Sequence, residues 1–261
     1  MDWETIMKVK IFTFTFNRPD ILQYQIDSFK RHIEDDFEFH VVYDTRDNEY
    51  LEEFSKICEK NNVYFHHHVS EPGNTPSFYN SDAIQWTYDN FIKPDENDFI
   101  TMIIDHDIFL IETLNVFEFM NEYDLSGQIQ TRGNVEYIWA GLILFMKSSL
   151  ENIDFNFYPQ TVDGQLLDSC GGTYELLRNK KIKFKPTDVV YPDDYQGINL
   201  RDPSNSNGGY EMELHADQKF LHFRNACNWH NGLKVNDANK TDLLFKILSD
   251  VLVDNYNNLE V

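Results

Sequence analysis

The first 107 residues alternate between short β-rich runs and longer amphipathic runs, and this order restricts the fold more than any other feature. The β-rich runs are residues 8–16, 37–43, 63–69 and 99–104, and the runs with helical spacing are 21–33, 50–61 and 77–91. Strands that alternate with helices form parallel sheets, because the helical crossover returns the chain to the same edge. The sequence therefore predicts an α/β fold with a mostly parallel central sheet flanked by helices.

Two aspartates, Asp105 and Asp107, follow the fourth β-rich run. In an extended segment residues i and i+2 point the same way, so both carboxylates can converge on one object. Burying them without partners would be costly, and Mg²⁺ or Mn²⁺ is the simplest partner because hard divalent cations prefer oxygen ligands. The alternative is a strand end at which the two carboxylates simply face water.

Polar residues also follow the other predicted strands. They are residues 15–20 at the end of the first strand, Asp44 after the second, and the loop 72–80 after the third. Ligands of parallel sheets bind beyond the carboxyl ends of the strands. We therefore expect these residues and the aspartate pair to lie at one edge of the sheet.

Composition excludes several classes of protein. The 261 residues carry a formal net charge of −22, which disfavours a surface built for nucleic acid or anionic lipid. Cys58, Cys170 and Cys227 lack metal-binding spacing, so we expect a reduced protein without disulfides. The sequence has neither a secretory signal nor an apolar run that could cross a bilayer. We predict a cytoplasmic protein, and peripheral membrane contact stays open.

The second half of the sequence lacks the regular alternation of strands and helices, which predicts a less regular part of the same domain. Strands are expected at 125–130, 137–146, 182–184 and 220–223, helices at 173–179 and 241–256, and a long loop at 192–213. The absence of a clear linker predicts a single domain over 1–261, with a nucleotide-sugar-binding half at 8–124 and an acceptor-binding half at 125–261.

Three βα units and a fourth strand, followed by D-x-D and an irregular second half, resemble the nucleotide-sugar glycosyltransferases of the GT-A fold. The chain is most similar to small family-2-like members, over residues 8–232. Residues 13–19, which read Thr-Phe-Thr-Phe-Asn-Arg-Pro, are similar to the segment that lines the nucleotide in that group. The resemblance implies nucleotide contacts by Thr13, Thr15, Asn17, Arg18, Asp44 and Asp105.

The resemblance also implies a metal site and an acceptor site. Asp105 and Asp107 would hold the metal together with a late histidine, for which His222 is the first candidate and His230 the second. Asp168 is the preferred catalytic base and Asp163 the second candidate. The alternatives are that either acid caps a helix and that His222 is a hydrogen-bonded structural residue. The run of histidines at 66–68 is interpreted as a solvated strand end.

These residues predict a metal-dependent hexosyltransferase that uses Mn²⁺ or Mg²⁺. Its donor would be a nucleotide-diphosphate sugar, with a UDP-sugar favoured, and its acceptor a hydroxyl of a growing glycan. A non-catalytic module that binds nucleotide sugars or glycans is the first alternative. A D-x-D phosphohydrolase is the second, but those enzymes place the acid after their first strand. The sugar, the acceptor, the stereochemical outcome and the oligomeric state stay open.

Overall fold

The computed structural model describes residues 8–15, 17–44, 48–70, 75–195, 198–199, 212–224, 242 and 244–249. Two compact units share the chain, and neither is continuous in sequence. The first unit comprises Met1–Pro19, Ile33–His106 and Leu114–Thr187, and the second comprises Asp20–His32, Asp107–Thr113 and Asp188–Val261. The boundary between the units therefore passes between His106 and Asp107, inside the D-x-D sequence.

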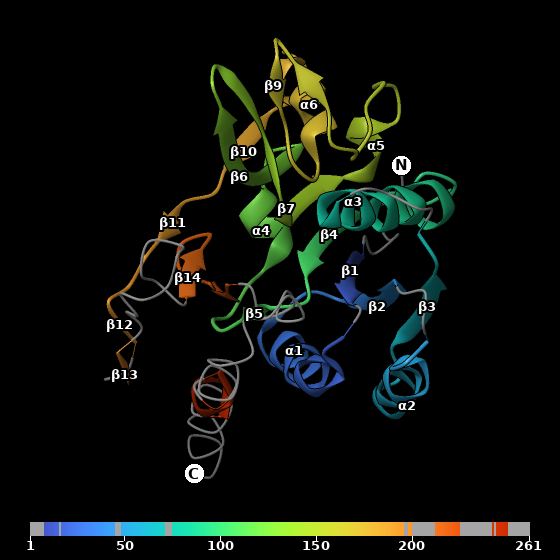
Figure 1. The fold of residues 1–261 in the computed structure, drawn as a ribbon, viewed down its shortest axis with the longest axis vertical. Helices are drawn as coiled ribbons and strands as arrows, with labels where there is room; N and C mark the ends of the chain where they lie inside the picture. The colour runs from blue at the N-terminus through green and yellow to red at the C-terminus, as the bar shows by residue number, and fades with distance from the viewer. Residues whose placement is uncertain are drawn as a thin grey trace. The chain divides into compact units, whose positions relative to one another are not determined.

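The first unit contains a seven-stranded sheet with the order β10-β6-β7-β4-β1-β2-β3 (Figure 1). Its strands are β1 (Val9–Thr15), β2 (Phe37–Asp44), β3 (Tyr64–His68), β4 (Ile100–Asp105), β6 (Leu125–Arg132), β7 (Val135–Met146) and β10 (Phe184–Pro186). Strands β3, β2, β1 and β4 pair in parallel, and so do β10 and β6, whereas β7 is antiparallel to both of its neighbours. The predicted mostly parallel α/β sheet is confirmed.

Helices of this unit cover both faces of the sheet. Its helices are α2 (Leu51–Asn61), α3 (Pro76–Thr87), the π-helix Tyr88–Ile92, α4 (Val116–Met120), α5 (Lys147–Leu150), the 3₁₀ turn Gly171–Thr173 and α6 (Tyr174–Arg178). Val42 packs in a buried cluster with Ile84 of α3, whereas Tyr43 contacts Phe54 of α2 at a ring distance of 5.0 Å. Adjacent strand residues point to opposite faces, so α2 and α3 lie on opposite sides (Figure 1).

Local signals account for the beginning of α3. The Thr75 hydroxyl accepts a hydrogen bond from the Phe78 backbone N–H, and Pro76 stands at the first helical position. Threonine is a favoured N-cap, and proline is pre-organised for the first turn of a helix. The helix accordingly begins one residue before the predicted start. After a short β8–β9 hairpin (Thr161–Val162 and Gln165–Leu166) the chain reaches the turn that precedes α6.

The second unit contains an antiparallel sheet with the order β11-β14-β15-β5. Its elements are α1 (Pro19–His32, whose first residue belongs to the first unit), β5 (Ile108–Leu110), β11 (Val189–Val190), β12 (Asp194–Tyr195), β13 (Ile198–Asn199), β14 (Met212–His215), β15 (Phe220–Phe223) and helical residues 242 and 244–249. Met212 and Leu214 pack with Ile21 of α1 in one buried cluster. Glu213 and His215 alternate with these residues and point to the other face.

Two expectations about local structure are corrected. Residues 106–107 form a turn between β4 and β5, so the extended segment expected through Asp105 and Asp107 is interrupted. The expected loop at 192–213 contains β12, β13 and the start of β14, because these segments find antiparallel partners. In the described part of the chain, no helix has both the length and the apolar character needed to cross a bilayer.

Candidate metal centre and strand-end site

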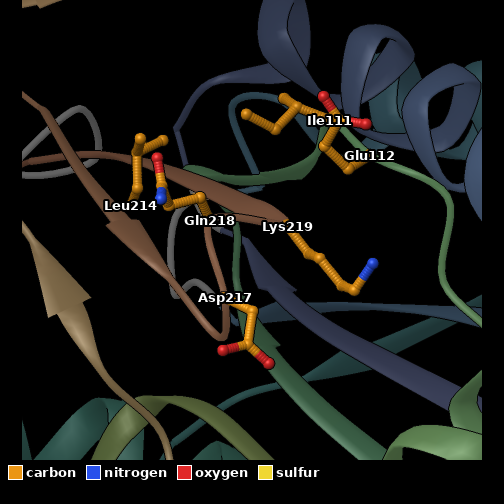
Figure 2. Close-up of a pocket in the computed structure, with 6 residues that line it drawn as sticks. All are labelled: Ile111, Glu112, Leu214, Asp217, Gln218 and Lys219. Atoms are coloured by element: carbon orange, nitrogen blue, oxygen red, sulfur yellow. The ribbon is translucent and has the colours of Figure 1, made fainter.

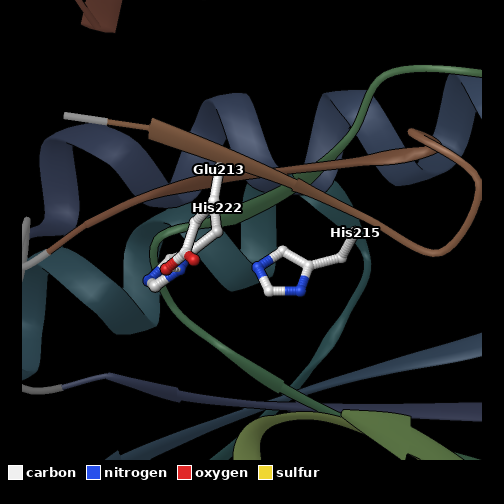
Figure 3. Close-up of side chains that lie close together, drawn as sticks. All are labelled: Glu213, His215 and His222. Carbon is white, nitrogen blue, oxygen red and sulfur yellow. Dashed lines mark hydrogen bonds and ion pairs between the residues drawn. The ribbon is translucent and has the colours of Figure 1, made fainter. Parts of the chain in front are cut away.

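Three buried side chains of the second unit converge on one face of the β14–β15 hairpin (Figure 3). Glu213 and His215 are two residues apart on β14, and His222 is the cross-strand partner of Glu213 on β15. One potential ligand atom from each residue lies within 4.8 Å of those of the other two. Imidazole and carboxylate groups are the ligands of many divalent metal sites, so the three residues form a candidate metal centre.

Asp107 approaches the same histidine from the turn before β5. Its Oδ1 is 3.6 Å from His222 Nε2, while Glu213 Oε1 is 3.0 Å from His222 Nδ1. The Phe223 backbone N–H donates to the Asp107 carbonyl at 2.9 Å, which fixes the turn against β15. The structure therefore brings together two residues, Asp107 and His222, that the sequence had proposed as ligands of one metal.

The charges around this centre are strongly coupled. Burial alone would raise the pKa of Glu213, but its hydrogen bond from His222 and the nearby His222, His215 and Arg224 side chains lower that pKa to about 2. Burial lowers the pKa of His215 to about 4, against the opposing charge of Glu213. Glu213 is thus ionised and His215 neutral near pH 7, and these are the protonation states that metal ligation requires.

Asp105 belongs to the first unit, where it shares an environment with Asp168. Asp105 ends β4 opposite Phe14 of β1. Burial raises the pKa of the Cys170 thiol, and the carboxylates of Asp105 and Asp168 both raise it further. Asp105, the last residue of β4, and Asp168, the preferred catalytic base, therefore both raise the pKa of the same buried thiol.

Neither candidate base caps a helix. Asp168 is exposed, and its Oδ1 accepts a hydrogen bond of 2.8 Å from the Ser169 backbone N–H. The N-cap of α6 is Thr173, five residues further on. Asp163 is exposed in the turn between β8 and β9, with a φ of 49°. The helix-cap alternative is therefore wrong for both acids.

The predicted nucleotide residues lie at the carboxyl ends of β1 and β2. Thr13 and Thr15 are buried, and Thr15 Oγ1 is 3.4 Å from His106 Nε2. Asn17 and Arg18 are partly exposed. Asp44 is half-buried and accepts hydrogen bonds from the backbone N–H and the hydroxyl of Ser70, at 3.0 and 2.7 Å. Burial raises the pKa of Asp44 in spite of these two donors.

The histidine run at 66–68 is not a solvated strand end, and this interpretation is corrected. His66 Nε2 lies 3.0 Å from His40 Nδ1, and His68 Nε2 lies 3.0 Å from Asp82 Oδ2 on α3. The Tyr158 hydroxyl donates to the other oxygen of Asp82 at 2.9 Å. The acid that pairs with His68 is fourteen residues away in sequence, so inspection of neighbouring residues missed it.

Glu213 and His215 are the residues of the candidate centre that the sequence did not single out. Glu213 is the last residue of the segment 192–213, which is rich in Asp, Asn, Ser and Gly and predicted a loop, and His215 follows two residues later. The available signal was the alternation Met-Glu-Leu-His at 212–215, a short half-buried strand pattern. His230 and Cys227 lie outside the described residues, as do residues 250–256 of the predicted last helix.

A separate hollow of about 390 Å³ lies in the second unit, next to the β14–β15 turn (Figure 2). Ala216, Asp217 and Gln218 of this turn have φ values of 51°, 56° and 63°. Lys219 donates from Nζ to the Thr113 carbonyl at 2.8 Å. None of the residues proposed from the sequence lines this hollow, whose lining is Ile111, Glu112, Leu214, Asp217, Gln218 and Lys219.

Comparison with known proteins identifies no family. No protein-family model and no curated protein matches the sequence. Among solved structures, the chain is similar to an active-site mutant of LgtC, with a TM-score of 0.38 and 12% sequence identity. The similarity covers 56% of this chain and 60% of that chain. A likeness this distant carries no functional argument, so the proposal below depends on the residues themselves.

Proposed function

We propose that this chain is a metal-dependent glycosyltransferase that moves a sugar from a nucleotide-diphosphate sugar to a hydroxyl acceptor. The observation that carries the proposal is the approach of His222 Nε2 to Asp107 Oδ1, at 3.6 Å. Asp107 was proposed as a ligand because it follows the fourth strand, and His222 because the family uses a late histidine. Two residues 115 positions apart are thus neighbours, as a shared metal would require.

The donor atoms fit a divalent cation. Asp107 and His222 offer one oxygen and one nitrogen, and both are buried. Glu213 and His215 lie near His222 and would form an alternative ligand set with it. Mn²⁺ accepts this mixture of ligands, and Mg²⁺ would use chiefly the carboxylates. When bound, the cation would neutralise charge on the departing diphosphate. The assignment of Asp105 as a metal ligand stays a prediction.

The remaining roles belong to residues of the first unit. Asn17, Arg18 and Asp44 would hold the nucleotide at the carboxyl ends of β1 and β2. In an inverting transfer the Asp168 carboxylate would take the proton of the acceptor hydroxyl, as the acceptor oxygen bonds to the sugar carbon and the bond to the diphosphate breaks.

The test is a panel of UDP-, GDP- and dTDP-sugars with Mn²⁺, followed by release of nucleotide diphosphate and by thermal shift. Asp107→Ala should reduce Mn²⁺-dependent release by roughly 10²-fold or more. Glu112→Ala is the matched control, because Glu112 is an exposed acid of the same chain segment. Wild-type release by Asp107→Ala would contradict the metal assignment. A thermal shift without release would indicate a binding module, because ligand binding alone raises stability.

A further inference from the structure

His222 presents each ring nitrogen to a different carboxylate. Nδ1 lies 3.0 Å from Glu213 Oε1, and Nε2 lies 3.6 Å from Asp107 Oδ1. Glu213 and His222 are directly opposite one another in the β14–β15 ladder, where side chains on one face are close neighbours. The register of the two strands therefore sets the contact between Glu213 and His222.

The two contacts have different chemical consequences. A neutral imidazole carries one N–H and one lone pair, on different nitrogens. If Nδ1–H donates to Glu213, the lone pair is on Nε2, the atom that faces Asp107. The other tautomer would direct an N–H toward Asp107 and would leave that side without a nitrogen ligand. A carboxylate behind a ligating histidine fixes the tautomer and raises the basicity of the ligating nitrogen.

Glu213 is itself held in place. Arg224 Nε lies 3.4 Å from the same Oε1 atom that accepts from His222, and Glu213 is 7% exposed. We propose that Glu213 is a positioning residue that holds His222 as the Nδ1–H tautomer and directs Nε2 toward a divalent cation bound with Asp107. This role rests on the proposed function, because it requires the cation.

The competing arrangement is a cation held directly by Glu213, His215 and His222. In that arrangement Glu213 is a ligand, and His215 contributes as much to affinity as Glu213 does. If Glu213 only positions His222, removal of the His215 ring leaves the Asp107–His222 pair intact. Variants of Glu213 and His215 therefore separate the two arrangements.

The first measurement needs neither metal nor sugar. Long-range ¹H–¹⁵N spectra of the metal-free full chain, recorded as the pH is raised until the His222 ring holds a single proton, report which imidazole nitrogen carries that proton, and His222→Gln assigns the signals. The wild type should have Nδ1 protonated and Nε2 bare. Glu213→Ala should lose this preference, whereas Glu213→Gln should keep it because the amide oxygen still accepts. Nε2 protonation in the wild type, or an unchanged tautomer in Glu213→Ala, would overturn the proposal.

The second measurement is Mn²⁺ affinity, followed by the loss of the free-ion EPR signal. Glu213→Ala should bind Mn²⁺ about 10- to 100-fold more weakly than the wild type. His215→Ala should change the affinity by less than about threefold, and so should the control Glu112→Ala, since neither side chain supports His222 in this arrangement. Equal losses of Mn²⁺ affinity in Glu213→Ala and His215→Ala would show that both residues ligate the cation directly and would overturn the positioning role. An unchanged affinity in Glu213→Ala would also overturn the proposal.

Failure of this inference and failure of the proposed function give different results. A wild type that binds Mn²⁺ as tightly as Glu213→Ala overturns only the role of Glu213. A wild type that binds no Mn²⁺ overturns the metal dependence and the role of Glu213 together. If Glu213→Ala does not fold, the near-isosteric Glu213→Gln takes its place in the Mn²⁺ titration. This variant keeps the hydrogen-bond acceptor but loses the charge, so it should bind Mn²⁺ roughly 3- to 10-fold more weakly than the wild type.

Discussion

The Nδ1 atom of His40 lies 3.0 Å from the Nε2 atom of His66, so one ring donates a hydrogen bond to the other across β2 and β3. The two rings are also stacked, with an angle of 8° between their planes. Burial and then the proximity of His66 lower the pKa of His40 to about 3, and burial also lowers the pKa of His66. Both histidines are therefore neutral in the folded protein near pH 7.

This pair should make the protein less stable in mild acid. The unfolded chain binds a proton at each histidine near pH 6.5, whereas folded His40 binds one only near pH 3. The contribution of His40 to stability should therefore be greatest above pH 6.5 and should fall by about 1.4 kcal/mol per pH unit as the pH decreases toward 3. Urea unfolding at several pH values should give a shallower dependence for His40→Gln than for the wild type. His67→Gln, an exposed change on β3, is the control and should keep the wild-type pH dependence of the free energy of unfolding. An equal pH dependence in His40→Gln and the wild type would contradict the prediction.

Gly172 should not tolerate a side chain. A Cβ atom at this position would lie 2.2 Å from the Asn156 carbonyl oxygen and 2.5 Å from its Oδ1. Asn156 Oδ1 already accepts hydrogen bonds from the Tyr158 backbone N–H and from the Gln160 side chain, so Asn156 cannot easily move away from an added methyl group. We expect Gly172→Ala to lower the free energy of unfolding by about 1–3 kcal/mol. Gly164→Asn is the control, because Gly164 has a φ of 77° with no atom near its Cβ position, and Asn tolerates this conformation.

The Tyr158–Asp82 hydrogen bond should stabilise the fold measurably. Asp82 is 8% exposed, and its two oxygens contact Tyr158 and His68. Tyr158→Phe removes a donor from a buried carboxylate and should cost about 1.5–3 kcal/mol. Tyr174→Phe, which loses an exposed contact with Arg178, should cost under about 0.5 kcal/mol. A double-mutant cycle with Asp82→Ala measures the coupling, and a coupling energy near zero would show that Tyr158 acts through packing alone.

Asp168→Asn should lower the transfer rate by roughly 10²-fold or more, with donor affinity nearly unchanged, if Asp168 is the base. Asparagine can still accept the bond from the Ser169 N–H, so the fold should be kept. Asp163→Asn is the matched comparison, since Asp163 is also exposed and asparagine tolerates its left-handed backbone. A rate loss confined to Asp163→Asn would move the role to that residue, and equal losses of affinity and rate in Asp168→Asn would indicate a contact with the donor sugar.

The sequence alone determined the central sheet. Four β-rich runs alternate with amphipathic runs, and strand and helix periods are local properties that any segment carries in its own residues. The same reasoning marked Asp44, Asp105 and Asp107 at strand ends, because a buried apolar run followed by an acid is visible without knowledge of the fold. Asp168 and His222 came only from a resemblance to a family, and their roles stay predictions.

The tertiary structure decided which distant residues meet. Residues 212–215 are a strand only because β15 and β11 supply hydrogen-bonding partners on both sides, and four alternating residues are too few to predict that alone. The pairing of Glu213 with His222, and the approach of Asp107 to the other nitrogen of that ring, depend on strand register. His68 meets Asp82 because a strand end and a helix face are packed together. Contacts of this kind arise from packing between segments that are separate in the chain, and no local pattern in the sequence encodes them.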